Sequence, residues 1–339
     1  MNFFIYRKPG HGKAEGAISG SLLQGLHADA FAVAPFDGSE SHVFSIPNER
    51  PIASADLGLI DAIAADSIGG KAYRFPASST DCDTHRRMVE HIVSDIEGGR
   101  LGKCVAARAI VHDGKIALAE SFLRLCDAYP NAFVTCFHTG PTGTWLCATP
   151  ERLLSRRGDR LLAMSLAGTR TAGTEQHDSL WDEKNIGEQR VVTEFIAGTL
   201  AAEGLQVTTD GPVTYNAGPV EHLMTQIEAS GRDLTFGESV RMATLLSPTP
   251  ALCGLPRDAA AVIISACEDF QRGYYGGFIG PIYADGDFDL YVNLRSALIE
   301  KERYCLFAGG GIVKGSDPER EWAETERKSR TMTDALCFA

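Results

Sequence analysis

The sequence predicts an α+β fold in which antiparallel sheets and interleaved helices form a single domain. Apolar, strand-like segments are separated by short turns that contain Gly and Asp, a pattern typical of hairpins. Helical segments fall between these strands without strict alternation, which favours antiparallel over parallel sheets. The 339 residues contain no internal repeat, linker or low-complexity segment, so one domain fits them better than two.

Residues 1–80 show only weak strand and turn patterns and are predicted to be the N-terminal part of the same domain; residues 81–339 form its main part. Asp83 and Thr84 begin a predicted helix with an apolar stripe, which ends at Gly98. The segment 102–115, GKCVAARAIVHDGK, is predicted to be a strand whose Asp-Gly pair begins a hairpin turn. Further helices are predicted at 117–128, 181–204 and 257–270, with strands at 132–138 and 144–149 between the first two.

Two helix starts have the pattern of a capping box, in which a hydroxyl side chain and a glutamate three residues later bond each other's backbone N–H. Thr235 and Glu238 predict a helix that stops at Ser247, before Pro248. Ser316 and Glu319 predict the start of the last helix, with a proline in its first turn.

Composition excludes several classes of function. The net charge of −12 argues against a surface for nucleic acid or for anionic membranes. No apolar run approaches the roughly 20 residues of a membrane span, and the N-terminus lacks the features of a signal peptide. The nine cysteines are at least ten residues apart, which is the pattern of neither a disulfide framework nor a zinc site. These observations predict a cytoplasmic protein with reduced thiols.

Carboxylates on two predicted helices suggest a cation site. Glu321, Glu324 and Lys328 share one face of the last helix, which for an arbitrary helix would be a solvated face with ion pairs. Three consecutive glycines shortly before this helix would let backbone N–H groups approach a ligand. Glu188 lies on the long middle helix, four residues after Lys184. Two glutamates from separate helices suit Mg²⁺, which prefers few protein oxygens and keeps much of its hydration.

Ten short segments, in this order, resemble the chorismate-utilising enzymes, the family of anthranilate, aminodeoxychorismate, salicylate and isochorismate synthases. The segments cover residues from about 100 to 339, and they are GKCVAARAI, ATPERLL, SLAGTR, WDEKNIGEQ, VEHLMT, SPTPALCGLPRDAA, RGYYGGFIG, VNLRSALI, FAGGGIV and DPEREWAETERKS. Each segment is short, but ten in the family's order are specific. Residues 1–80 contain no such segment.

Two features of the resemblance indicate the isochorismate synthase branch. The isochorismate and salicylate enzymes have a lysine at the head of the first strand of this set, where this chain has Lys103. The isochorismate synthases also have an HPTPA-type segment, which SPTPALCGLP at 247–256 matches except for its first residue, Ser247. The chain departs from the family pattern at Gly187, Gln189 and Pro281 as well.

The resemblance implies a fold, a reaction and the groups that perform it. The fold would be a central β-sandwich of antiparallel sheets with helices on the outside. The reaction would add water at C2 of chorismate while the C4 hydroxyl leaves. Lys103 would be the base that activates the water, and Glu151 the acid that protonates the leaving hydroxyl, because burial would keep the amine and the carboxyl partly uncharged. Mg²⁺ would be held by Glu188 and Glu324, with Glu321 behind them or on a bound water.

The resemblance also implies which residues bind the small-molecule substrate, chorismate. Arg295 and the backbone of Gly309, Gly310 and Gly311 would take the enolpyruvyl carboxylate, with Lys328 as a second cation. The remaining contacts, to the ring carboxylate, the hydroxyl side and the pocket wall, would come from Gly168, Thr169, His222 and Tyr275.

Two alternatives stay open at this point. A salicylate synthase would share Lys103 and Glu151 but would also expel pyruvate, and a chorismate-binding protein without activity would keep the cavity alone. Amine-using members of the family are disfavoured by Lys103 and by the segment 247–256. The sequence predicts neither the oligomeric state nor whether a product would enter menaquinone or siderophore synthesis.

Overall fold

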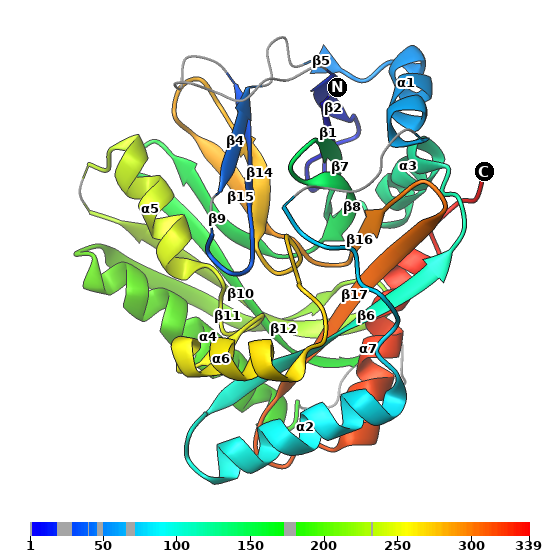
Figure 1. The fold of residues 1–339 in the computed structure, drawn as a ribbon. Helices are drawn as coiled ribbons and strands as arrows, with labels where there is room; N and C mark the ends of the chain where they lie inside the picture. The colour runs from blue at the N-terminus through cyan, green and yellow to red at the C-terminus, as the bar shows by residue number, and fades with distance from the viewer. Residues whose placement is uncertain are drawn as a thin grey trace.

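The computed structural model describes residues 2–18, 29–39, 41–45, 50–65, 72–172, 181–231 and 233–339 of the chain. Two antiparallel sheets pack against each other, and the helices lie around them (Figure 1). This arrangement confirms the predicted α+β fold, with antiparallel sheets packed as a sandwich in one domain.

The first sheet has nine strands and carries most of the site described below. In spatial order these are β13 (Gly254–Leu255), β6 (Lys103–Asp113), β17 (Arg303–Ile312), β16 (Ser296–Ile299), β8 (Gly143–Thr149), β7 (Phe133–Thr139), β1 (Phe3–Arg7), β2 (Glu15–Ile18) and β5 (Arg50–Pro51). Each neighbouring pair runs antiparallel.

The second sheet has eight strands, again antiparallel. Their spatial order is β11 (Gln206–Asn216), β12 (Val220–Ser230), β10 (Arg160–Thr171), β9 (Arg152–Arg157), β15 (Phe288–Val292), β14 (Phe278–Ile282), β3 (Ala30–Ala34) and β4 (His42–Ser45). N-terminal strands therefore lie at one end of both sheets.

The described residues form seven α-helices, which are α1 (Ser54–Ala65), α2 (Cys82–Glu97), α3 (Leu118–Ala128), α4 (Glu183–Ala202), α5 (Phe236–Leu246), α6 (Arg257–Cys267) and α7 (Pro318–Thr333). Helix α4 packs on β10 and β12, whereas α7 packs on β17 and α2. Figure 1 shows α7 beside β6 and β17, on the same side of the molecule as α2. The two helices that carry the predicted carboxylates thus pack on different sheets.

The main hydrophobic core lies between the sheets. Phe133 of β7 stacks on Tyr291 of β15 with ring centroids 4.1 Å apart, and Phe4 of β1 meets Phe31 of β3 at 5.0 Å. Burying such aromatic side chains supplies much of the stabilisation of a sandwich, since each removes a large apolar area from water. A second cluster joins α1, α3 and the end of α7 to the outer face of the first sheet, and a third joins α2 and α6 to β6.

Most predicted helix boundaries agree with the structure. Thr235 and Glu238 form the predicted capping box, and the C-cap of α5 is Ser247. The second capping box was wrong: the N-cap of α7 is Asp317, whose carboxylate accepts a hydrogen bond from Arg320 N. The hydroxyl of Ser316 instead accepts from Val313 N, because it closes the turn that precedes the helix.

The hairpin predicted at Asp113-Gly114 was also wrong. The neighbours of β6 are β13 and β17, both distant in sequence. Gly114 N donates to Glu302 O across the sheet, and the chain continues through a bridge between Ile116 and Phe338 into α3. An Asp-Gly pair allows a tight turn but does not determine which strand follows it.

Candidate active site

The candidate site lies where β17 of the first sheet extends past the end of its neighbour, β16. β16 begins at Ser296, which pairs with Phe307 of β17, while β17 continues to Ile312 with β6 on its other side. Beside Ala308–Ile312 there is therefore a space that β16 does not fill. A cavity occupies it, lined by Val105, Pro150, Glu151, Leu166, Ala167, Thr169, Glu188, His222, Ala251, Leu252, Tyr275, Leu294, Arg295, Phe307, Ala308, Gly309, Gly311 and Lys328.

Arg295 occupies the start of this gap. It directly precedes β16, is buried, and has a backbone φ of 47°, in the left-handed region that disfavours side chains. Its guanidinium donates to His222 Nε2 at 3.0 Å and to Lys328 O at 3.5 Å. Two cations, Arg295 and Lys328, thus lie at one end of the cavity, where they can attract a carboxylate.

The contact with Arg295 fixes the tautomer of His222. A guanidinium has only donors, so His222 Nε2 must accept and Nδ1 must carry the proton. Nδ1 then donates to Gly168 O at 2.8 Å. Burial, together with the positive charges of Arg295 and Lys328, holds the pKa of His222 well below its usual value. His222 is therefore a neutral group that positions Arg295 and the chain at Gly168.

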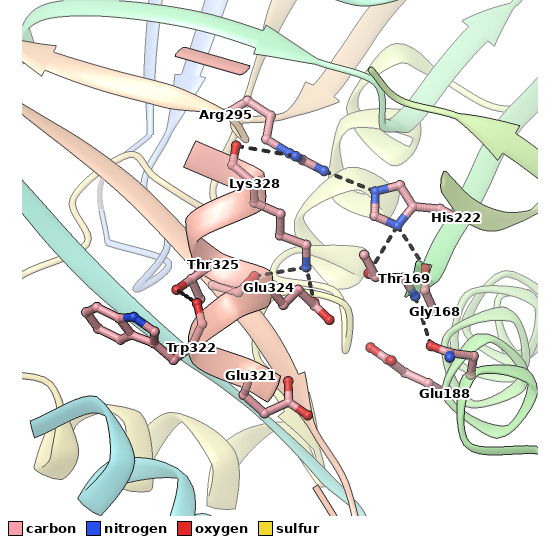
Figure 2. A network of polar contacts seen from close by, with 12 residues as sticks. Gly168, Thr169, Glu188, His222, Arg295, Glu321, Trp322, Glu324, Thr325 and Lys328 are labelled. Carbon is pink, nitrogen blue, oxygen red and sulfur yellow. Dashed lines mark hydrogen bonds and ion pairs between the residues drawn. The ribbon is translucent and has the colours of Figure 1, made fainter. Parts of the chain in front are cut away.

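Three glutamates lie close to the cations, and each is paired with a lysine. Figure 2 shows Glu324 beside Lys328, with Glu321 further along α7 and Glu188 on the side of His222. The distances from Nζ to carboxylate oxygen are 2.8 Å for Lys103–Glu188, 2.7 Å for Lys184–Glu321 and 2.6 Å for Lys328–Glu324. The site thus contains three carboxylates balanced by three amines.

The pKa values of Glu321, Glu324 and Lys184 reflect the charges around them. Burial and the negative charge of Glu324 raise the pKa of Glu321, although Lys184 opposes this. Burial also acts to raise the pKa of Glu324, but the adjacent Lys328 outweighs it and the net shift is downward. Burial lowers the pKa of Lys184, yet the charges of Glu321, Glu188 and Glu324 turn the net shift upward. Lys184 therefore lies in the field of all three carboxylates.

The glycine run of β17 makes room for these side chains. A Cβ on Gly311 would lie 2.2 Å from Glu188 Oε1, and one on Gly310 would lie 3.1 Å from Glu321 Oε2 and 3.5 Å from Glu324 Oε1. On Gly309 a Cβ would lie 3.0 Å from the hydroxyl of Tyr275. The backbone of β17 can approach three acidic side chains because it has no side chains of its own here.

The residues present fit a hard divalent cation held by few protein ligands. Glu321 Oε2 is buried without a hydrogen-bond partner, and carboxylates from α4 and α7 lie beside two adjacent glycines, Gly311 and Gly310. Among the described residues, no three or more His, Cys, Asp or Glu side chains form a ready-made metal centre. Two carboxylates supplemented by water and substrate oxygens suit Mg²⁺ better than zinc, which prefers nitrogen and sulfur ligands.

Lys103 and Glu151 are both almost completely buried, at 0% and 2% exposure. Lys103 begins β6, where Leu255 of β13 pairs with it. Glu151 directly precedes β9, and its Oε1 is buried without a hydrogen-bond partner. Burial raises the pKa of Glu151 to about 8, although Lys103, Arg295 and Lys328 act to lower it. The carboxyl of Glu151 therefore carries a proton at neutral pH and can donate it.

The structure brings the predicted site residues together. Nine of the fourteen line the cavity, and the five that do not are Lys103, Gly168, Gly310, Glu321 and Glu324. Four of these five lie next to a group that lines the cavity, as Lys103 does beside Glu188, and Glu321 lies one step further away, beside Gly310 and Lys184.

Two polar residues of the site had no role in the sequence prediction. Lys184 pairs with Glu321, and the side-chain oxygen of Asn185 accepts from Thr169 N at 2.9 Å, which ties β10 to α4. Both belong to the WDEKN segment, so the segment itself was the available signal. The apolar walls at Val105, Leu166, Leu252 and Phe307 could not be distinguished from ordinary core residues.

Within the described part of the chain, every helix is too short or too polar to cross a lipid bilayer. The model of a family described as chorismate binding enzyme matches residues 67–337. The isochorismate synthase MenF of Bacillus subtilis is 33% identical over 270 residues, which are 77% of this chain and 57% of the relative. The isochorismate synthase DhbC of the same organism is 34% identical over 271 residues, 75% of this chain and 68% of the relative.

A solved structure from Bacillus anthracis, described as a putative 2,3-dihydroxybenzoate-specific isochorismate synthase, DhbC, has the same fold. It superposes with a TM-score of 0.81 and 22% identity over 98% of this chain and 95% of that one. The chain spans less than two thirds of the length of MenF, so the likeness of sequence concerns only part of that relative. With a family match over most of its length, the chain belongs to the chorismate binding enzyme family.

Proposed function

We propose that the chain is a Mg²⁺-dependent isochorismate synthase. The observation that carries the proposal is that two cations, three carboxylates and a buried acid lie in or beside one cavity. Arg295 and Lys328 can bind the carboxylates of a dianion, three glutamates in or beside the cavity can hold a cation, and the buried acid Glu151 lines the same cavity. The relatives MenF and DhbC, which are isochorismate synthases by name, support the same reaction.

The reaction moves a hydroxyl group from C4 to C2 of the ring without a net change in composition. Water is a weak nucleophile and hydroxide a poor leaving group, so the reaction needs a base and an acid. In the proposal Lys103 takes a proton from the attacking water as the new C–O bond forms at C2. The ring double bonds shift, the C4–O bond breaks, and Glu151 gives its proton to the departing oxygen. Solvent returns both groups to their starting states.

Glu188 and Glu324 would hold Mg²⁺, with Glu321 supporting them from the buried side. When bound, the cation neutralises part of the negative charge of the glutamates and of the substrate's ring carboxylate. The residues themselves have three further tasks. Arg295 and Lys328 orient the enolpyruvyl carboxylate, His222 keeps Arg295 in place, and Tyr275 with its apolar neighbours excludes water from the ring.

Incubation of the purified protein with chorismate and Mg²⁺, with chromatography of the products, tests the proposal. Isochorismate is the expected product. Salicylate and pyruvate would indicate the lyase reaction as well, and binding without turnover would indicate a protein that only holds chorismate.

Two variants test the assignment of acid and base. Lys103→Ala and Glu151→Gln should each reduce turnover by at least about 10²-fold, because each removes one proton-transfer step. Chorismate binding, measured by calorimetry, should remain, since neither residue is the main partner of a substrate carboxylate. Full activity in either variant would remove that residue from the mechanism without affecting the proposed reaction.

A further inference from the structure

A buried ion pair lies outside the substrate cavity and has no role in the chemistry above. Arg272 Nε donates to Glu268 Oε2 at 2.8 Å, a second contact joins Nη2 to Oε1, and both side chains are 2% exposed. Neither residue lines the substrate cavity, whereas both line a second, larger cavity. Burying two charges is costly unless their hydrogen bonds are satisfied, so the partners of this pair show its role.

The pair takes the place of a strand along β6. Among the strands of the described residues, none lies beside the outer edge of β6 past β13, which pairs with Lys103 and Cys104. Glu268 Oε1 accepts from Ala107 N at 3.0 Å, and Arg272 Nη2 donates to Val105 O at 2.9 Å. These side chains satisfy backbone groups that a sheet edge would otherwise leave unpaired.

The same pair holds two further segments of the cavity wall. Arg272 Nη1 donates to Leu252 O at 2.7 Å, inside the segment 247–256. The guanidinium also lies 5.9 Å from the centre of the Tyr275 ring, and the backbone bond from Tyr275 N to Arg272 O, at 3.0 Å, joins the same two residues without the side chain. Val105, Leu252 and Tyr275 come from three segments distant in sequence, and all three line the substrate cavity.

We infer that Arg272 and Glu268 form a positioning pair that sets the shape of the substrate cavity from behind, and with it the affinity for the substrate. The inference uses the proposed function only for the identity of that substrate, chorismate. Lys103 lies two residues before Val105 in β6, but it is also fixed by Leu255 of β13 and by Glu188, and Glu151 lies at the start of β9, which the pair does not bond. Loss of the pair therefore weakens binding more than it slows the chemical step.

Kinetics and binding of Arg272→Met test the inference in the full-length protein. The KM and the calorimetric Kd for chorismate should both rise about tenfold or more, while kcat changes by less than about threefold, because the cavity wall moves and the reacting groups do not. The KM and Kd of Arg272→Lys should lie between those of the wild type and those of Arg272→Met. An ammonium keeps the pairing with Glu268 but cannot reach the carbonyls of Val105 and Leu252 at once.

Arg257→Met is the matched control. Arg257 lines the same second cavity and donates to Leu245 O and Ser247 O, but it bonds no residue of the substrate cavity. Its loss should lower stability and leave the KM unchanged. An unchanged Kd in folded Arg272→Met, or an equal rise in KM in Arg257→Met, would overturn the inference.

Amide hydrogen exchange provides a second test that does not depend on activity. Glu268→Gln removes the charge of the acceptor that bonds the Ala107 amide, and Glu268→Ala removes the acceptor itself. Exchange at Ala107 should therefore be faster in Glu268→Gln than in the wild type, and fastest in Glu268→Ala. Unchanged exchange at Ala107 in Glu268→Ala would also overturn the inference. If the wild-type protein did not bind chorismate, the proposed function would fail, and the exchange at Ala107 would still decide whether the pair holds β6.

Discussion

At Glu151, burial and charge act in opposite directions. Burial removes the carboxyl from water and raises its pKa, whereas Lys103, Arg295 and Lys328 attract the carboxylate form and lower it. Burial prevails, and the resulting pKa of about 8 leaves Glu151 protonated at neutral pH. A carboxyl that must donate a proton is active only in this form, which gives the reaction a dependence on pH.

Turnover should therefore decrease as the pH rises through about 8, the pKa of Glu151. Below that value the group is protonated and can act as the acid, and above it the group becomes an ionised carboxylate without a proton to give. A profile of kcat from pH 6 to pH 10 measures this. A kcat that stays constant through pH 9.5 would contradict the role of Glu151 as the acid.

Lys184 places a positive charge where a cation is proposed to bind. Its amine pairs with Glu321 and lies in the field of Glu188 and Glu324. Lys184→Met should tighten the binding of Mg²⁺ or Mn²⁺, measured by calorimetry without substrate, by about tenfold, since the repulsion between amine and cation is lost. The partial exposure of Lys184 reduces this effect through screening by water.

Lys184→Arg is the matched control, because it keeps the charge and should leave the affinity for the cation unchanged. Weaker cation binding in Lys184→Met would show that the amine serves mainly to orient Glu321.

At the scale of elements, the site depends on how β17 passes the two glutamate-bearing helices. Gly311 has no positive φ, so its backbone would accept a side chain, but the space for a Cβ is taken by Glu188 Oε1 and by Lys103 Cε at 3.0 Å. Gly198, within α4, has no atom within 4 Å of such a Cβ. The two glycines therefore have different reasons to be glycine.

Gly311→Ala should keep the fold and reduce turnover by about 10²-fold or more, because the new methyl group displaces both Glu188 and Lys103. Gly198→Ala should leave turnover unchanged and stabilise the protein by about 0.5–1 kcal/mol, through better helix propensity. Thermal unfolding and steady-state kinetics of both variants check this. Normal turnover in Gly311→Ala would indicate that the Lys103–Glu188 pair is not needed.

The sequence predicted elements well where the signal was local. The apolar stripe of α2 and the capping box of α5 depend on residues within a few positions of one another, and both predictions hold. The hairpin at Asp113-Gly114 failed because strand pairing depends on distant segments: β6 pairs with β17, nearly two hundred residues later. The second capping box failed by one residue, since an aspartate at the N-cap competes with the neighbouring serine.

At the scale of the molecule, the site residues are spread from Lys103 to Lys328 and meet only because the two sheets bring α4 and α7 together. Periodicity could not have shown this, and the family resemblance supplied the set of residues. Arg272 begins the RGYYGGFIG segment, but the resemblance gave it no role and did not include Glu268, because a buried ion pair bonding to backbone groups has no pattern that sequence spacing reveals. Its role follows only from three-dimensional contacts.

The N-terminal strands complete both sheets, although the family match begins at residue 67. β1 covers the edge of β7 and β3 covers the edge of β14, and their side chains Phe4 and Phe31 belong to the main core. A fragment of residues 67–339 should therefore aggregate, because two sheet edges and the aromatic core become exposed. A fragment that is monodisperse by size-exclusion chromatography and unfolds cooperatively would contradict this.

The backbone of Arg295 shows where this protein is poorly optimised for stability. A left-handed conformation costs an ordinary residue about 1–2 kcal/mol, a strain that glycine would avoid. A selection for heat resistance alone would therefore tend to replace the guanidinium that faces the cavity. Engineering a more stable form of this protein therefore requires selection for the proposed activity in the same round, so that the gain in stability does not remove the proposed anchor of the substrate.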